Sequence, residues 1–270
     1  MQFVFTANPE DYTNRGSIVT PLKDRIGSQI LTHYPEDIET AKTITAQEAK
    51  LDKDQVEMVH VPELAKDLLE QISFEARESE FIDEKSGISA RMSITGYENL
   101  LSTAERRTLK SGEDKTLLRF SDFMGVIPSI TGKVELVYEG EQEGAAAVAL
   151  QLIGDSVKTL FPDYFPQIEK LKKAEEKTPY DDLVEWFFDQ SGFELPDDIS
   201  EKEYKEKLDS VKPLTQLVEK HQPGIAESEK YFLMEFLLWG LVEFKQLSKQ
   251  RFSTGMQFKD LYCSYISGFN

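Results

Sequence analysis

Two polar residues near the start of the chain stand where proteins commonly place chemistry. Phe3 to Phe5 is a short aromatic and β-branched run that predicts a buried strand, and Asn8 follows it just before a proline. Open α/β sheets bind ligands beyond the carboxyl ends of their strands, so an amide side chain at this position indicates a ligand site. Thr20-Pro21 is a helix-start signal, and Arg25 falls within the helix that it predicts.

The residues around Asn8 and Arg25 form two linked motifs. The first reads TANPEDYTNRG, and the second, PLKDRIGSQILTHYP, also contains a predicted second strand at Ile30 to Thr32. Over the segment 1–35 the chain resembles the AAA+ ATPases of the magnesium chelatase subunit I and MoxR group. The chain departs slightly from that group at Ile26, where the family usually has Phe.

The resemblance implies roles in ATP hydrolysis for three residues. Asn8 matches the sensor 1 position, whose amide orients the attacking water. Arg25 matches the arginine finger, which reaches the γ-phosphate in the neighbouring subunit and accelerates transfer by roughly 10³ to 10⁵. Arg91, which follows a break and opens a helix, matches the looser sensor 2 pattern and would lie near the phosphates. ATP and Mg²⁺ are the implied cofactors of the full-length protein, and neither is expected to bind this chain tightly on its own.

Each of these residues also has an ordinary structural explanation. An Asn that precedes a proline is a good turn residue, and Arg25 and Arg91 could be solvent-exposed helix charges. Arg15, in a glycine-containing loop, is a second candidate for a contact in trans. The three histidines stand far apart without metal-ligand spacing, so the sequence predicts no metal site in the chain.

Two parts that nucleotide hydrolysis needs are missing from the sequence. A phosphate loop reads Gly-x-x-x-x-Gly-Lys-Ser/Thr, whereas Gly132-Lys133 is followed here by Val134. An acidic strand end for Mg²⁺ is expected before the Asn8 strand and is also absent. The sequence therefore looks like the C-terminal part of a larger ATPase, and the chain as given is expected to be inactive. A phosphate-loop sequence in the reading frame upstream of Asn8 would identify the full-length protein as an ATPase.

Composition sets the class of protein. The chain has 270 residues, of which 40% are hydrophobic and 30% charged, which is typical of a soluble globular protein. The net charge of −18 argues against nucleic acid and against anionic membranes as partners. A single cysteine excludes an internal disulfide, and with no signal peptide we expect a cytoplasmic protein. The longest apolar stretch, Tyr231 to Phe244, is too short to span a bilayer.

The remaining patterns predict a mainly α fold that follows a two-strand remnant of an α/β AAA+ core. We expect the end of that core at 1–37, a helical lid at 38–140 and an acidic helical C-terminal domain at 141–270. Pro62 opens an amphipathic helix, and Ser200 with Glu203 forms a capping box. The half of the chain after Glu141 reads as wholly helical, with a last helix at about 226–249. Its aromatic side chains are expected in the core, with a partner-binding face as the alternative.

The resemblance also implies partners. Members of the group assemble into homo-oligomeric rings, commonly hexamers, and use ATP hydrolysis to remodel a partner that often contains a von Willebrand factor A domain. Because nothing in the sequence recognisably binds a porphyrin, we favour a remodelling ATPase over a pigment-synthesis enzyme. The alternative is a non-catalytic helical interaction module that keeps a relic of the ATPase core.

Overall fold

The computed structural model describes residues 3–6, 24–83, 88–168, 178–190, 192–252 and 255–261. The chain is mainly helical. Its described α-helices are α2 (Ile38–Glu48), α3 (Lys53–Met58), α4 (Glu63–Glu78), α5 (Arg91–Ser111), α6 (Ile127–Thr131), α7 (Tyr138–Glu143), α8 (Ala145–Tyr164), α9 (Asp181–Asp189), α10 (Glu201–Ser210), α11 (Lys212–His221) and α12 (Glu227–Glu243). A 3₁₀ helix, η2, spans Phe120–Gly125, and the strands are β1 (Val59–His60), β2 (Thr116–Leu117), β3 (Phe193–Pro196), β4 (Leu247–Phe252) and β5 (Gly255–Asp260).

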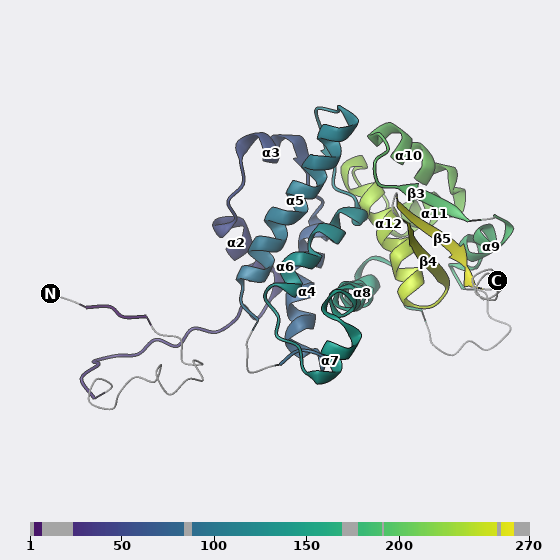
Figure 1. Ribbon diagram of the computed structural model, residues 1–270. Helices are drawn as coiled ribbons and strands as arrows, with labels where there is room; N and C mark the ends of the chain where they lie inside the picture. The colour runs from purple at the N-terminus through teal and green to yellow at the C-terminus, as the bar shows by residue number, and fades with distance from the viewer. Residues whose placement is uncertain are drawn as a thin grey trace.

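The helices share one continuous core. Helix α8 packs against α4 on one side and against α12 on the other. In Figure 1, α2 to α6 lie on the side nearer the N-terminus, and α9 to α12 with the larger sheet lie on the opposite side. Buried apolar side chains form a single cluster that extends from Val59 to Phe258. The segments predicted as lid and C-terminal domain therefore contribute to the same core, and the boundaries at 37 and 140 stay a prediction.

Local sequence signals place several helices correctly. Helix α4 begins directly after Pro62 and buries its apolar positions, including Leu64 and Leu68. Helix α5 ends where Gly112 adopts a left-handed conformation with φ 71°, which glycine tolerates at a helix C-terminus. The capping box of α10 is present, since Ser200 and Glu203 each accept a hydrogen bond from the other's backbone N–H.

Helix α12 is the most deeply buried helix of the C-terminal half. Its aromatic residues Phe232, Phe236 and Trp239 are all at most 2% exposed, so they belong to the core rather than to a partner-binding face. Phe120 of η2 stacks on Trp239 with ring centroids 4.4 Å apart. Such ring pairs stabilise a core by about 0.5–1.5 kcal/mol beyond the area that they bury. This contact joins η2 to the centre of the molecule.

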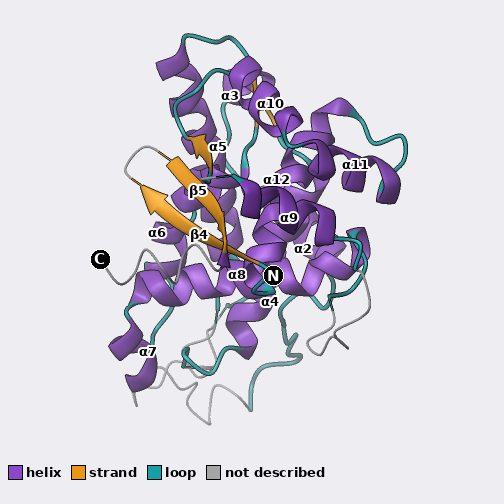
Figure 2. Ribbon diagram, turned by 90° about the vertical axis from the view of Figure 1, so that its right-hand side faces the viewer, coloured by secondary structure: helices purple, strands orange, loops and turns teal. Residues whose placement is uncertain are grey.

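The prediction of a wholly helical second half is wrong. Strands β3, β5 and β4 form an antiparallel sheet in that order, with β4 packed against α12 and β5 against α9 (Figure 2). Helix α12 ends at Glu243 rather than at 249 because Lys245 takes a left-handed conformation with φ 57°. The chain then reverses into β4, whose Leu247 is buried.

The two strands predicted at the start of the chain are also absent. Phe3 to Phe5 and Ile30 to Thr32 have no regular structure, and their apolar side chains are exposed, with Phe3 at 66% and Ile30 at 89%. Arg25 lies in a turn rather than in a helix. Parallel strands are normally buried between neighbours, and no strand of the described residues pairs with these segments. Asn8, Arg15 and the Thr20-Pro21 helix start lie outside the described residues.

Candidate functional site

Arg25 lies on a segment that projects from the helical body. Figure 1 shows the segment around residues 24–35 running outside the packed helices. The Arg25 side chain is exposed and forms no ion pair with any residue that the structure describes. Farther along, the Tyr34 ring lies 4.4 Å from the guanidinium carbon of Arg77 on α4, which attaches the end of the segment to the body. Among the described residues, Arg25 is therefore an unpaired cation on a segment whose other end, at Tyr34, contacts α4.

Arg91 is also exposed, but it stands on a fixed element. It is the first residue of α5, and its backbone N–H donates to Ser89 Oγ at 3.2 Å. Two residues on, the Ser93 hydroxyl hydrogen-bonds to that of Ser73 on α4, and both serines are buried. The Arg91 side chain has no ion-pair partner in the described part of the chain. The first turn of α5, packed against α4, thus presents a guanidinium that no described residue neutralises.

The structure does not bring the predicted site residues into one constellation. Arg25 lies on the projecting segment and Arg91 on the helical body, and no contact joins them. Asn8 lies outside the described residues. The roles of Asn8, Arg25 and Arg91 therefore stay predictions.

A buried ion pair that the sequence did not reveal lies below α5. Arg107 donates from Nη2 to Asp122 Oδ2 at 2.9 Å and from Nε to Oδ1 at 3.2 Å, in a bidentate arrangement. The two side chains are 5% and 3% exposed. The remaining nitrogen of Arg107 donates to Thr116 Oγ1 at 2.9 Å. The pair therefore holds α5, η2 and β2 together with its hydrogen bonds satisfied.

A second buried group connects η2 to α10 and α12. Glu235 Oε2 accepts from the Tyr204 hydroxyl at 2.6 Å and from the Phe120 backbone N–H at 2.8 Å. The guanidinium of Arg119 lies over the Tyr204 ring at 4.4 Å and donates to two backbone carbonyls that precede α10. Burial raises the pKa of Glu235 to about 7, although its two hydrogen bonds act in the opposite direction.

Glu235→Gln is expected to remove a pH dependence of stability. The pKa of Glu235 rises from 4.5 to about 7 on folding, so its contribution to stability is complete below pH 4.5 and is lost as the pH rises through 7. Between acidic and alkaline pH, Glu235 should lower the unfolding free energy of the wild type by roughly 3 kcal/mol. This part of the pH dependence should be absent from Glu235→Gln. Urea unfolding at a series of pH values measures this difference. Exposed Glu219→Gln is the control, and equal profiles for the two variants would contradict the assignment.

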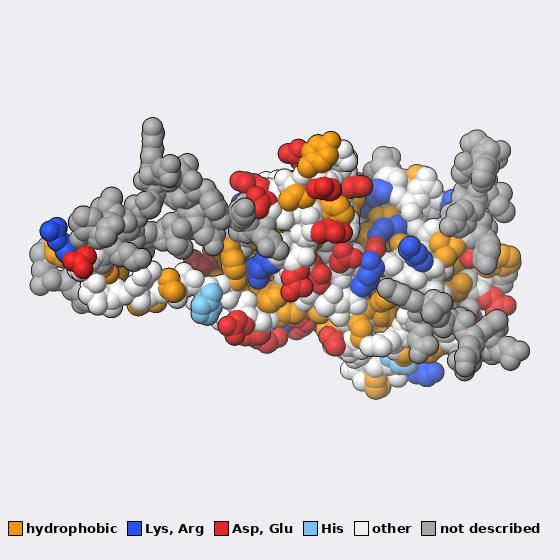
Figure 3. Space-filling view, turned by 90° about the horizontal axis from the view of Figure 1, so that it is seen from below, with side chains coloured by type: hydrophobic (Ala, Val, Ile, Leu, Met, Phe, Trp, Pro, Cys, Tyr) orange, Lys and Arg blue, Asp and Glu red, His pale blue; other side chains and the backbone are white. Residues whose placement is uncertain are grey.

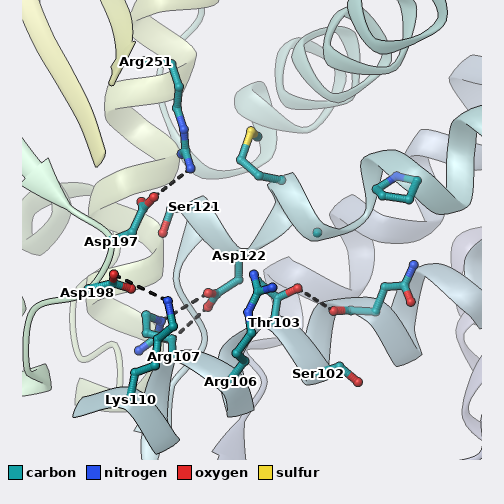
Figure 4. Close-up of a pocket in the computed structure, with 14 residues that line it drawn as sticks. Ser102, Thr103, Arg106, Arg107, Lys110, Ser121, Asp122, Asp197, Asp198 and Arg251 are labelled. Carbon is teal, nitrogen blue, oxygen red and sulfur yellow. Dashed lines mark hydrogen bonds and ion pairs between the residues drawn. The ribbon is translucent and has the colours of Figure 1, made fainter. Parts of the chain in front are cut away.

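A polar groove opens beside the buried ion pair. It has a volume of about 720 Å³ and is bounded by α5 and η2 on one side and by residues after β3 and in β4 on the other (Figure 4). Its charged lining residues are Arg106, Arg107, Lys110, Asp122, Asp197, Asp198 and Arg251. Sequence reasoning missed the groove because its two walls are far apart in the chain. The one available signal was Arg107, a charge on the otherwise apolar face of α5 that also carries Leu100 and Ala104.

The chain matches no protein-family model, no curated protein and no solved structure. Among the described residues, no three His, Cys, Asp or Glu side chains are grouped so that they could hold a metal ion. Within the same part of the chain, every helix is too short or too polar to cross a membrane.

Proposed function

We propose that the chain is the C-terminal part of a chelatase-like or MoxR-like AAA+ ATPase that remodels a partner protein. The two motifs around Asn8 and Arg25 are the sequence basis of this proposal. The observation that supports it most is the exposure of the apolar side chains that precede and follow Arg25 in the sequence. Phe3, Phe5, Ile30 and Leu31 are each at least 66% exposed, on the same segments that the motifs occupy.

Burial of these exposed apolar side chains against another part of the protein would be favourable. Burying one Phe, Leu or Ile side chain contributes about 1.5–3 kcal/mol. In an intact ATPase core, neighbouring strands would cover Phe3 to Phe5 and Ile30 to Thr32 on both faces. The same docking would fix the loop between them and bring Asn8 to the end of a strand. The exposed segments are thus available to pack against the rest of an ATPase core, as the proposed function requires.

The positive charges of the two exposed arginines suit binding of a nucleoside triphosphate. Arg25 would neutralise the negative charge that develops on the γ-phosphate bound to a neighbouring subunit, and Arg91 would lie against phosphates in its own subunit. Asn8 would orient the attacking water. Bound ATP and Mg²⁺ supply the phosphoryl chemistry itself. Neither guanidinium has to break an ion pair with a described residue before it acts.

The proposed assembly is a homo-oligomeric ring, with a hexamer as the expected form. The remodelled partner would be a protein, with a von Willebrand factor A domain protein as the leading candidate. Nucleic acid and membrane are not proposed as partners because the chain is strongly acidic. The cytoplasm is the proposed location.

A non-catalytic interaction module is the second candidate. Its specific support is the groove beside α5, whose lining residues include neither Arg25 nor Arg91. Of the predicted catalytic residues that the structure describes, Arg25 and Arg91 are both exposed. In this alternative, the ATPase motifs would be a relic.

Nucleotide turnover distinguishes the two functions. We expect the chain of 270 residues to show no Mg²⁺-dependent ATP hydrolysis, because its sequence contains no phosphate loop. A polypeptide that joins a phosphate-loop segment of the same gene to this chain should assemble and hydrolyse ATP. Saturable turnover by the short chain, undiminished by further purification, would overturn the assignment. Absence of turnover in an assembled longer form that binds ATP would favour the interaction module.

A further inference from the structure

The projecting segment, residues 24–35, is held to the helical body near its end. Figure 1 and Figure 3 show this segment extending away from the packed helices. Among the described residues, no hydrogen bond or ion pair joins residues 24–33 to the helices. Tyr34 differs, since the guanidinium carbon of Arg77 on α4 lies 4.4 Å from the centre of its ring. The contact between Tyr34 and Arg77 therefore attaches the segment to the body.

Arg77 contacts aromatic rings rather than carboxylates. It lies in the last turn of α4, one turn after Phe74, and its guanidinium carbon is 5.1 Å from the centre of the Phe74 ring. It forms no ion pair with a described residue, and its buried Nε atom has no hydrogen-bond partner among them. A cation over the face of an aromatic ring is attracted by the negative charge of that face. The rings of Tyr34 and Phe74 are thus the partners that the structure gives to this guanidinium.

The residues that follow Tyr34 restrict the backbone at this point. A residue before a proline is confined to extended conformations, and Pro35 itself has a fixed φ. Asp37 then caps α2, since its Oδ1 accepts from a backbone N–H in the first turn of that helix at 2.7 Å. Helix α2 is in turn joined to α4 by Lys42 and Asp67, whose charged atoms are 2.7 Å apart. The chain between the ring contact and α2 therefore has little conformational freedom.

The position of Arg25 depends on the direction in which the projecting segment leaves α4. Arg25 is exposed and precedes Tyr34 in this segment, so the attachment at Tyr34 limits where its guanidinium can reach. We propose that the contact between Tyr34 and Arg77 is a joint that holds the projecting segment on α4, and that both are positioning residues for Arg25. The second part rests on the proposed function. Because Tyr34 is 41% exposed, the contact favours the attached over the detached segment by only roughly two- to fivefold, and the segment can also detach.

The joint is tested in the chain of 270 residues by cleavage with a glutamate-specific protease. Glu36 lies between the ring contact and α2, so cleavage after it requires the segment to detach, and its rate follows the detached population. Release of the fragment 1–36 is measured by mass spectrometry. Arg77→Ala leaves the sequence around the cleaved bond unchanged and should raise the rate by roughly two- to fivefold. Tyr34→Phe keeps the ring and should be cleaved at the wild-type rate.

Two further variants separate the ring contact from other effects of the substitutions. Arg106→Ala is the matched control, because it removes an exposed arginine from α5 that forms no ion pair with a described residue, and its cleavage rate should not change. When Tyr34 is already replaced by leucine, Arg77→Ala should have no further effect. In an assembled longer form, Tyr34→Leu should lower kcat by roughly two- to fivefold without a change in the KM for ATP, and Tyr34→Phe should restore kcat.

Three results would overturn the proposal. The first is equal cleavage rates for Arg77→Ala and Arg106→Ala. The second is an effect of Arg77→Ala that persists in full when Tyr34 is leucine, which would show that Arg77 acts without the ring. The third is an unchanged kcat for Tyr34→Leu in an active assembled form, which would remove the positioning role. The cleavage measurements use no nucleotide, so their failure would leave the ATPase proposal standing. An assembled wild type without turnover would overturn the ATPase proposal and leave the joint standing.

Discussion

Under the proposed function, Arg25→Ala is expected to abolish ATP hydrolysis by the assembled full-length protein while leaving ATP binding nearly intact. An arginine finger acts on charge that develops in the transition state, so its removal lowers turnover by roughly 10³ to 10⁵ without a matching loss of ground-state affinity. Turnover is measured by phosphate release, and binding by a fluorescent ATP analogue. The exposed position of Arg25, without an ion pair among the described residues, predicts that the variant folds normally.

Lys212→Ala is the control for this experiment. Lys212 is an exposed cation at the start of α11 with no predicted role, and its removal should leave turnover unchanged. Asn8→Ala should also lose turnover, because water would be misplaced within its own subunit. If Arg25→Ala hydrolyses ATP at the rate of the wild type, Arg25 is not the finger and Arg15 becomes the candidate.

Asp122→Ala should be the most destabilising single change in the described helical body. It leaves Arg107 buried and without its bidentate partner, and it removes the acceptor of the Arg119 backbone N–H at 2.8 Å. Breaking one side of a buried ion pair costs about 3–5 kcal/mol. Urea unfolding followed by circular dichroism measures the loss.

The pair formed by Lys110 and Asp198 provides the matched comparison on the same groove. Both side chains are mostly exposed, so Asp198→Ala should change stability by about 0–1 kcal/mol. The double variant Arg107→Met with Asp122→Leu should be more stable than Asp122→Ala alone, because no charge is then left buried. Similar unfolding midpoints for Asp122→Ala and Asp198→Ala would show that the buried pair does not stabilise the fold.

Local signals in the sequence predicted those elements whose causes are local. The start of α4 after Pro62 and the capping box at Ser200 depend on residues within one helical turn, and both are present. The burial of Phe236 and Trp239 followed from their large apolar area. A helix that is apolar on nearly every face has to lie inside a core, as α12 does.

The elements that were missed depend on distant partners or on unusual backbone. Phe193 pairs with Phe258 across the sheet, and no local pattern specifies a contact over that separation. Lys245 gave no sign of its left-handed conformation, which ends α12 and allows β4 to begin. The strands predicted at Phe3 to Phe5 and Ile30 to Thr32 were strand-like in composition only, since no described strand pairs with them.

The candidate site residues also fall into those that local motifs predicted and those that depend on distant parts of the chain. Arg25 and Arg91 were named from motifs, and the structure leaves both exposed. The groove could not be predicted, because Arg106 and Asp197 come from segments that only the folded chain brings together.

The measurement that tests the account most directly is ATP turnover by mixed rings. Arg25→Ala subunits of the proposed longer ATPase are mixed with subunits whose phosphate-loop lysine is replaced, and ring formation is verified. Some sites in these rings combine an intact phosphate loop with an intact finger from the neighbour, so we predict that turnover is partly restored. Asn8→Ala subunits in the same mixture should restore none, because every site then carries a defect. Mixed rings that form with Arg25→Ala subunits and stay inactive would contradict a role for Arg25 in trans.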